Sequence, residues 1–136
     1  MRAVALFLLP LLAGCGIPEN SPMMRPGEDC LTCHGSDARL HWYAAGTVYL
    51  DPQASAGEGV QGAEVAVTDA NGRKIGLTTN GAGNFYTAET LVFPATVQVR
   101  RGGNVNEMPV QAPEGGCNSC HSEPPSGGAK GRIYAP

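Results

Sequence analysis

The chain has 136 residues and a formal net charge of −3, which suits one compact domain with short appendages. The charge is too mild for a nucleic-acid-binding protein, and no basic cluster interrupts it, so we expect no nucleic-acid partner. The 19 glycines and 11 prolines are many for a globular domain, but fewer than in a disordered chain. We therefore expect a folded domain with a thin core.

Residues 1–14 predict a signal peptide. Arg2 supplies the positive end, and residues 3–12 are apolar but too short to span a membrane permanently. The segment ends in Leu12-Ala13-Gly14-Cys15, which resembles the lipobox of bacterial lipoproteins. The resemblance implies cleavage before Cys15 and acylation of its thiol. The alternative is an ordinary secretory signal with a chance cysteine.

The resemblance also bears on location. Gly16 follows the cysteine, and the absence of Asp at this position implies the outer membrane, on its periplasmic or cell-surface face, or an extracellular site. Residues 15–29 then read as a tether, because Pro18, Pro22 and Pro26 interrupt any regular helix or central strand.

Two five-residue stretches carry the chemistry: Cys30-Leu31-Thr32-Cys33-His34 and Cys117-Asn118-Ser119-Cys120-His121. Cys-x-x-Cys-His is the attachment sequence of a c-type haem, in which each thiol adds to one vinyl group of the porphyrin. The histidine that follows becomes the proximal iron ligand. The sequence therefore predicts two covalently bound haem c groups. The attachment residues are Cys30, Cys33, Cys117 and Cys120, and the proximal ligands are His34 and His121.

Two other interpretations use the same four cysteines. Two Cys-x-x-Cys pairs suit a zinc site, but zinc would leave both adjacent histidines idle. Two disulfides, each within one motif, would close only four-residue loops. The adjacent histidine and the second copy of the motif both favour haem.

The second axial position of each iron has few candidates. His41 is the only histidine outside the two motifs, so at most one haem can have two histidine ligands from this chain. Met24 lies six residues before the first motif and Met108 nine residues before the second, and a thioether is a good ligand of low-spin haem iron. Met24, Met108 and His41 are therefore the candidate distal ligands, and an iron left open or bound by a neighbouring subunit is the alternative.

Between the motifs the pattern predicts short strands separated by turns. The expected strands are residues 45–50, 63–68, 73–79, 84–87 and 96–101, with Ala63, Val65 and Val67 on one face of the second. Turns are expected at residues 69–72 and 80–83, where Asn-Gly pairs occur. Such spacing predicts a mainly β chain folded as an antiparallel β-sandwich.

The order of these pieces resembles the carboxypeptidase regulatory-like, or transthyretin-like, β-sandwich. The pieces are Gly46-Thr47-Val48, Val60-Gln61-Gly62-Ala63-Glu64-Val65, Thr79-Asn80-Gly81-Ala82-Gly83-Asn84-Phe85 and Val97-Gln98-Val99. In that family the domain is non-catalytic, so the resemblance implies a scaffold over residues 44–103. The flanking segments, 30–43 and 104–136, would bind the haems. We expect both segments to be irregular, and Arg132 to be either solvated or paired with a haem propionate.

Most of the chain after residue 14 resembles small dihaem c-type cytochrome lipoproteins of bacteria. The resemblance implies an electron-transfer protein, not an enzyme, in an extracellular or periplasmic chain. Its partners would be other redox proteins or a metal or mineral acceptor. We also expect the sandwich to separate two haem-bearing ends, which could join head to tail into a homopolymer. A peroxidase-like haem enzyme and a gas-binding sensor with one open iron are the alternatives.

Overall fold

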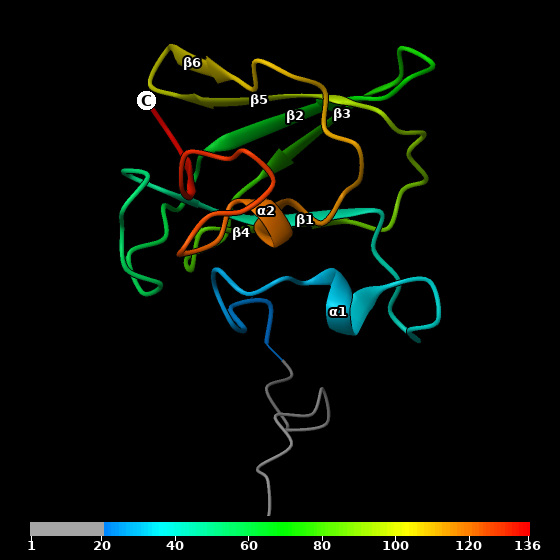
Figure 1. Ribbon diagram of the computed structural model, residues 1–136, viewed down its shortest axis with the longest axis horizontal. Helices are drawn as coiled ribbons and strands as arrows, with labels where there is room; N and C mark the ends of the chain where they lie inside the picture. Colours follow the sequence, from blue (N-terminus) through cyan, green and yellow to red (C-terminus); the bar gives the residue numbers. More distant parts are fainter. Residues whose placement is uncertain (1–20) are drawn as a thin grey trace, which may run out of the picture.

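The computed structural model describes residues 21–136, which fold into two β-sheets packed against one another (Figure 1). One sheet has three strands in the order β4-β1-β7, and the other has four in the order β3-β2-β5-β6. The strands are β1 Ala44–Tyr49, β2 Glu64–Thr68, β3 Lys74–Thr78, β4 Asn84–Thr87, β5 Thr96–Arg101, β6 Asn104–Glu107 and β7 Ile133–Tyr134. The expected class, a mainly β sandwich dominated by antiparallel pairs, is confirmed.

The core follows from the alternation that the sequence shows. Val65 and Val67 of β2 are buried, and the strand pairs antiparallel with both β3 and β5, so Val65 lies opposite Leu77 and Val99. From the other sheet, Val48 and Phe85 enter the same buried cluster. Side chains from both sheets therefore form one apolar layer, whose burial is the main stabilising term in a small sandwich.

Two aspartate- or asparagine-led turns connect the strands. The Asp69 carboxylate accepts hydrogen bonds from the backbone N–H groups of Asn71 and Arg73, which closes the β2–β3 turn. These backbone donors lower the pKa of Asp69 against the opposing effect of its burial, the largest single influence on it. The Asn80 side chain accepts from Ala82 and Asn84 in the same way before β4.

Two strands occur where the sequence predicts irregular chain. β6 (Asn104–Glu107) pairs antiparallel with β5, and β7 (Ile133–Tyr134) pairs parallel with β1. The apolar pattern of the sequence does not predict β6, because Val105 is its only apolar residue and that side chain is exposed. β7 brings the C-terminal tail back to the sheet that contains β1, so the tail completes the sandwich.

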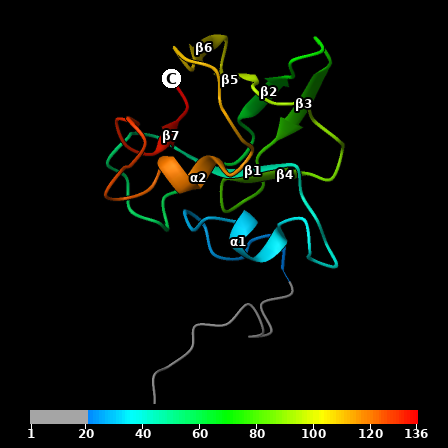
Figure 2. The same ribbon diagram turned by 45° about the vertical axis from the view of Figure 1, so that its right-hand side comes forward.

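The two Cys-x-x-Cys-His motifs form the only helical turns of residues 21–136, α1 Leu31–His34 and α2 Cys117–Cys120. α2 lies at the edge of the three-stranded sheet, because the preceding Gly116 forms a parallel bridge with Ala45 of β1. α1 lies beyond β1 and β4, on the side away from the four-stranded sheet (Figures 1 and 2). Over residues 21–136, no helix has the length and apolar character that crossing a membrane requires.

Candidate functional site

Each Cys-x-x-Cys-His motif is wound into one helical turn. In the first, His34 N–H donates to Cys30 O at 2.9 Å, and in the second, His121 N–H donates to Cys117 O at 3.0 Å. Residues three apart on such a turn are neighbours on the helix surface, so the two cysteines of each motif lie within one turn of each other. A c-type haem requires two thiols at this spacing, because each thiol bonds to one vinyl group of the same porphyrin.

Both motif histidines have the same ring nitrogen engaged by a carbonyl. Nδ1 of His34 lies 2.9 Å from Leu40 O, and Nδ1 of His121 lies 2.9 Å from Gly131 O. Because a carbonyl oxygen only accepts, Nδ1 must carry the proton, and Nε2 keeps its lone pair. Metal-binding histidines are commonly fixed in this way by a backbone carbonyl. Carbonyl groups of two unrelated loops therefore hold both imidazoles with the proton on Nδ1.

The first histidine is also held by a stack of rings. The Trp42 ring lies on His34 with 3.7 Å between centroids and 16° between planes. Tyr86 of β4 stacks on Trp42 in turn, at 4.2 Å and 11°. The plane of the His34 imidazole is thus fixed against the sandwich by aromatic contact as well as by its hydrogen bond.

The two motifs lie side by side. A Cβ built on Gly116, just before α2, would lie 3.2 Å from Asp29 Oδ1 and 3.6 Å from the Leu31 side chain of α1. The expectation that the sandwich separates two haem-bearing ends is therefore wrong. Residues 21–29 fold back under β1 and β4, and the chain after β6 returns to the edge of β1. The head-to-tail homopolymer, which that separation motivated, stays a prediction.

A buried asparagine connects the motifs. Asn118, within the second motif, is 2% exposed and accepts a hydrogen bond from Thr47 N–H of β1 at 3.1 Å. Its amide nitrogen donates to Glu28 O at 2.9 Å and to Thr47 Oγ1 at 3.1 Å. Glu28 is two residues before Cys30, so one side chain joins the second motif, β1 and the approach to the first motif.

Close packing sets α2 on β1. A Cβ built on Gly46, in the middle of β1, would lie 2.8 Å from the Phe85 ring and 3.0 Å from Cys117 Cβ. Only glycine leaves room for this approach, so the small residue at position 46 lets the second motif contact the core.

Two of the motif thiols, those of Cys30 and Cys117, have raised pKa values. Burial raises the pKa of Cys117 to about 12, and repulsion between its thiolate and that of the neighbouring Cys30 adds to the effect. Burial likewise raises the pKa of Cys30 to about 11, and nearby Asp29 adds to it. Reactive cysteines commonly have lowered pKa values, whereas burial raises the pKa of both of these thiols.

The neutral thiols give a direct expectation for the haem-free protein. Since the thiolate is the reactive form, Cys117 should react with iodoacetamide at pH 8 at least about tenfold more slowly than in the unfolded chain. The rate should rise as the pH approaches the raised pKa. Mass mapping of the alkylated peptides measures it, and equal rates at pH 8 in folded and urea-unfolded protein would contradict the assignment.

The remaining motif cysteines differ in state. Cys120 is free, as are Cys30 and Cys117, whereas Cys33 is disulfide-bonded. A thioether at Cys33 requires the reduced thiol, so that disulfide must open before a haem can attach there. Among residues 21–136, no three His, Cys, Asp or Glu side chains gather as metal ligands would.

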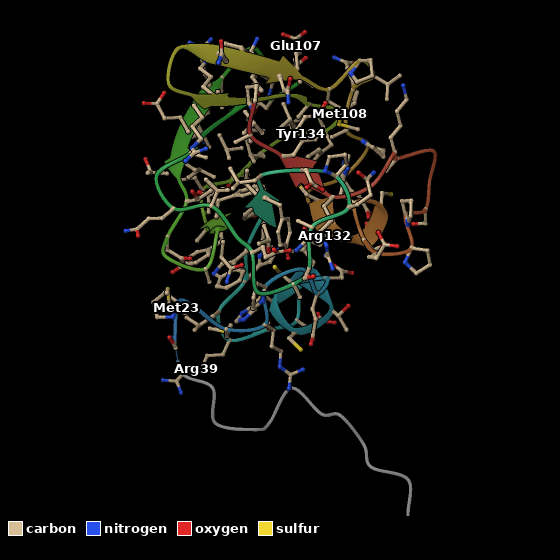
Figure 3. The ribbon with its side chains drawn as sticks, turned by 90° about the vertical axis from the view of Figure 1, so that its left-hand side faces the viewer. Met23, Arg39, Glu107, Met108, Arg132 and Tyr134 are labelled. Carbon is tan, nitrogen blue, oxygen red and sulfur yellow. The ribbon has the colours of Figure 1, made fainter. Side chains whose placement is uncertain are left out.

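The three candidate distal ligands, Met24, Met108 and His41, lie in separate parts of the fold. Met24 is half-buried in the segment under β4, where its carbonyl accepts from Asn84 at 2.8 Å, while Met23 is 47% exposed with its side chain against Gly81. Met108 follows β6 directly, and Figure 3 shows it at the level of the four-stranded sheet. His41 is half-buried, with its ring 4.5 Å from that of Tyr43.

Arg132 is buried, at 9% exposure, so it is not the solvated side chain that was one of the two expectations. Its Nε donates to Ala54 O at 2.9 Å, and its guanidinium lies 4.7 Å from the centroid of the Tyr49 ring. Sequence patterns do not reveal that Asn118 connects the two motifs or that Trp42 stacks on His34. The one available signal is that both residues lie within or close to a motif.

Comparisons with known proteins give no relative for this chain: no family model, no curated protein and no solved structure matches it. The resemblance to the transthyretin-like sandwich thus stays a prediction, and function must be inferred from the site itself. The expected acylation site, Cys15, and the expected signal peptide lie outside the described residues.

Proposed function

We propose that this chain is a dihaem c-type cytochrome whose activity is electron transfer. The observation that carries the proposal is the matched preparation of two Cys-x-x-Cys-His turns. Each motif has its two cysteines within one helical turn, and each histidine has Nδ1 committed to a carbonyl, His34 to Leu40 and His121 to Gly131. A chance pair of cysteine motifs gives no reason for both histidines to be fixed in the same tautomer.

The residues present fit covalent haem. Cys30 and Cys33 would hold one porphyrin with His34 as its axial ligand, and Cys117, Cys120 and His121 would hold the other. The haem supplies an iron that alternates between ferric and ferrous states, and the protein fixes its position and tunes its potential. The free thiols of Cys30, Cys117 and Cys120 leave these three attachment atoms available.

The placement of the motifs supports transfer within the molecule. Because the Asp29–Leu31 segment lies against Gly116, two haems attached there would be neighbours. An electron accepted at one would then have a short path to the other. The Asn118 side chain holds the two attachment segments in a fixed relation, which favours a constant rate of exchange.

The distal ligands and the setting of the protein complete the proposal. Met24 and Met108, or His41 at one iron, would supply the second axial ligands, since six-coordinate iron favours electron transfer over substrate binding. Acylation at Cys15 would anchor the exported chain to the outer membrane. Partners would be redox proteins or an extracellular metal acceptor, met through small, transient contacts.

Optical redox titration of the exported protein tests this function. We expect c-type bands that are low-spin in both oxidation states and two reversible one-electron steps. Carbon monoxide binding to the reduced protein would favour a gas sensor instead. High-spin ferric signals with peroxide turnover would favour an enzyme. A preparation without haem bands would contradict the proposal.

A further inference from the structure

A buried cation lies between the two motifs. Arg132 Nη1 is the one buried side-chain nitrogen or oxygen of residues 21–136 without a hydrogen-bond partner. No carboxylate in this part of the chain pairs with the guanidinium, whereas Arg25 pairs with Glu28 and Arg73 with Glu89. An arginine stays protonated even when buried, so Arg132 places an uncompensated positive charge inside the protein.

Residues next to each of the two motifs lie beside the Arg132 guanidinium or directly precede Arg132 in the chain. The preceding residue, Gly131, supplies the carbonyl that fixes His121 Nδ1 at 2.9 Å. On the other side, a Cβ built on Gly27 would clash with Arg132 Nη1, and Gly27 is three residues before Cys30. Gly27 has φ +85°, a conformation that favours glycine, so the backbone there is shaped to pass close to the guanidinium. Figure 3 shows Arg132 between β7 and α1.

The environment keeps the charge fixed. The Nε–Ala54 hydrogen bond and the Tyr49 ring orient the guanidinium from two directions. The pKa of Tyr49 is raised, chiefly by burial, while Arg132 lowers it and Cys30 makes a smaller contribution that raises it. A charge held in a region of low polarizability acts more strongly on its neighbours than one in water.

We propose that the positive charge of Arg132 raises the reduction potential of the two neighbouring haems. Reduction adds one negative charge to each haem, and a nearby fixed cation stabilises that state. The inference rests on the proposed function. It goes further by assigning control of the potential to a residue that does not bind iron.

The test compares midpoint potentials of the dihaem protein and three variants. In Arg132→Gln, we expect the ferrous-to-ferric ratio of at least one haem at a given potential to fall roughly tenfold, a shift of about 59 mV to lower values. Arg132→Lys keeps the charge and should retain most of the original potential. Arg73→Gln removes an exposed, ion-paired arginine and should leave both potentials unchanged.

Two results would overturn the inference. One is equal potentials in Arg132→Gln and the unmodified protein. The other is an equal fall in Arg132→Gln and Arg132→Lys, because the loss would then follow from packing and not from charge. Should Arg132→Gln fold poorly, Arg132→Met, which also removes the charge, provides the same comparison with Arg132→Lys. An absence of haem bands in every sample would contradict the proposed function and is distinct from either result.

Discussion

Replacing Cys117 and Cys120 together with serine is expected to reduce the haem content of the exported protein from two to one. Serine is close in size but forms no thioether with a vinyl group, so the second motif would lose its covalent haem. The Cys30→Ser/Cys33→Ser variant should do the same at the first motif. Pyridine haemochrome spectra, normalised to protein concentration, measure the content.

Matched controls lie inside the same turns. Thr32→Ala and Ser119→Ala each remove one hydroxyl, which donates to Asp29 Oδ2 at 3.1 Å in the first turn and to Gly116 O at 2.6 Å in the second. Both controls should retain two haems, because each leaves both thiols of its motif in place, although Ser119→Ala also removes a contact of its hydroxyl with Cys120 Sγ at 3.8 Å. Unchanged haem content in both cysteine variants would show that these motifs do not hold haem.

The second large effect is expected at Asn118. Changing it to alanine removes its three hydrogen bonds, which leaves the buried Thr47 N–H without a partner and Glu28 O with only the Cys30 thiol, 3.6 Å away. Each unsatisfied buried group costs about 1–3 kcal/mol, so we expect the free energy of unfolding to fall by about 3 kcal/mol. Urea unfolding followed by circular dichroism measures the change.

The control for Asn118 is Asn104→Ala at the start of β6, where the side chain is exposed. This change should stay within about 0.5 kcal/mol. The Asn118 variant should also be cleaved faster by protease within residues 21–29, since Glu28 loses its attachment to the second motif. A loss below about 1 kcal/mol, with unchanged proteolysis, would mean that Asn118 does not join the two segments.

The sequence was sufficient for elements whose signals are local. Alternating valines predicted β2 and β5, and the Asn-Gly turns predicted the boundaries of β3 and β4 to within about one residue. β6 and β7 were missed because their pairing depends on backbone partners. Val105 is exposed in β6, and β7 offers only Ile133 and Tyr134 to β1.

The candidate site shows the same division. The covalent residues could be predicted because the motif is continuous in sequence. The adjacency of the two motifs could not, since it depends on contacts such as Asn118 to Thr47, which are 71 residues apart. The aromatic stack on His34 likewise requires Tyr86, from a strand that only the fold brings near.

The mass of the intact exported chain under denaturing conditions is the most direct test of whether two porphyrins are bonded to this protein. Denaturation and acid release noncovalent ligands and zinc but leave thioether bonds in place. We expect the mass of the processed chain plus two haems. The mass of the processed chain alone would contradict every functional inference made above.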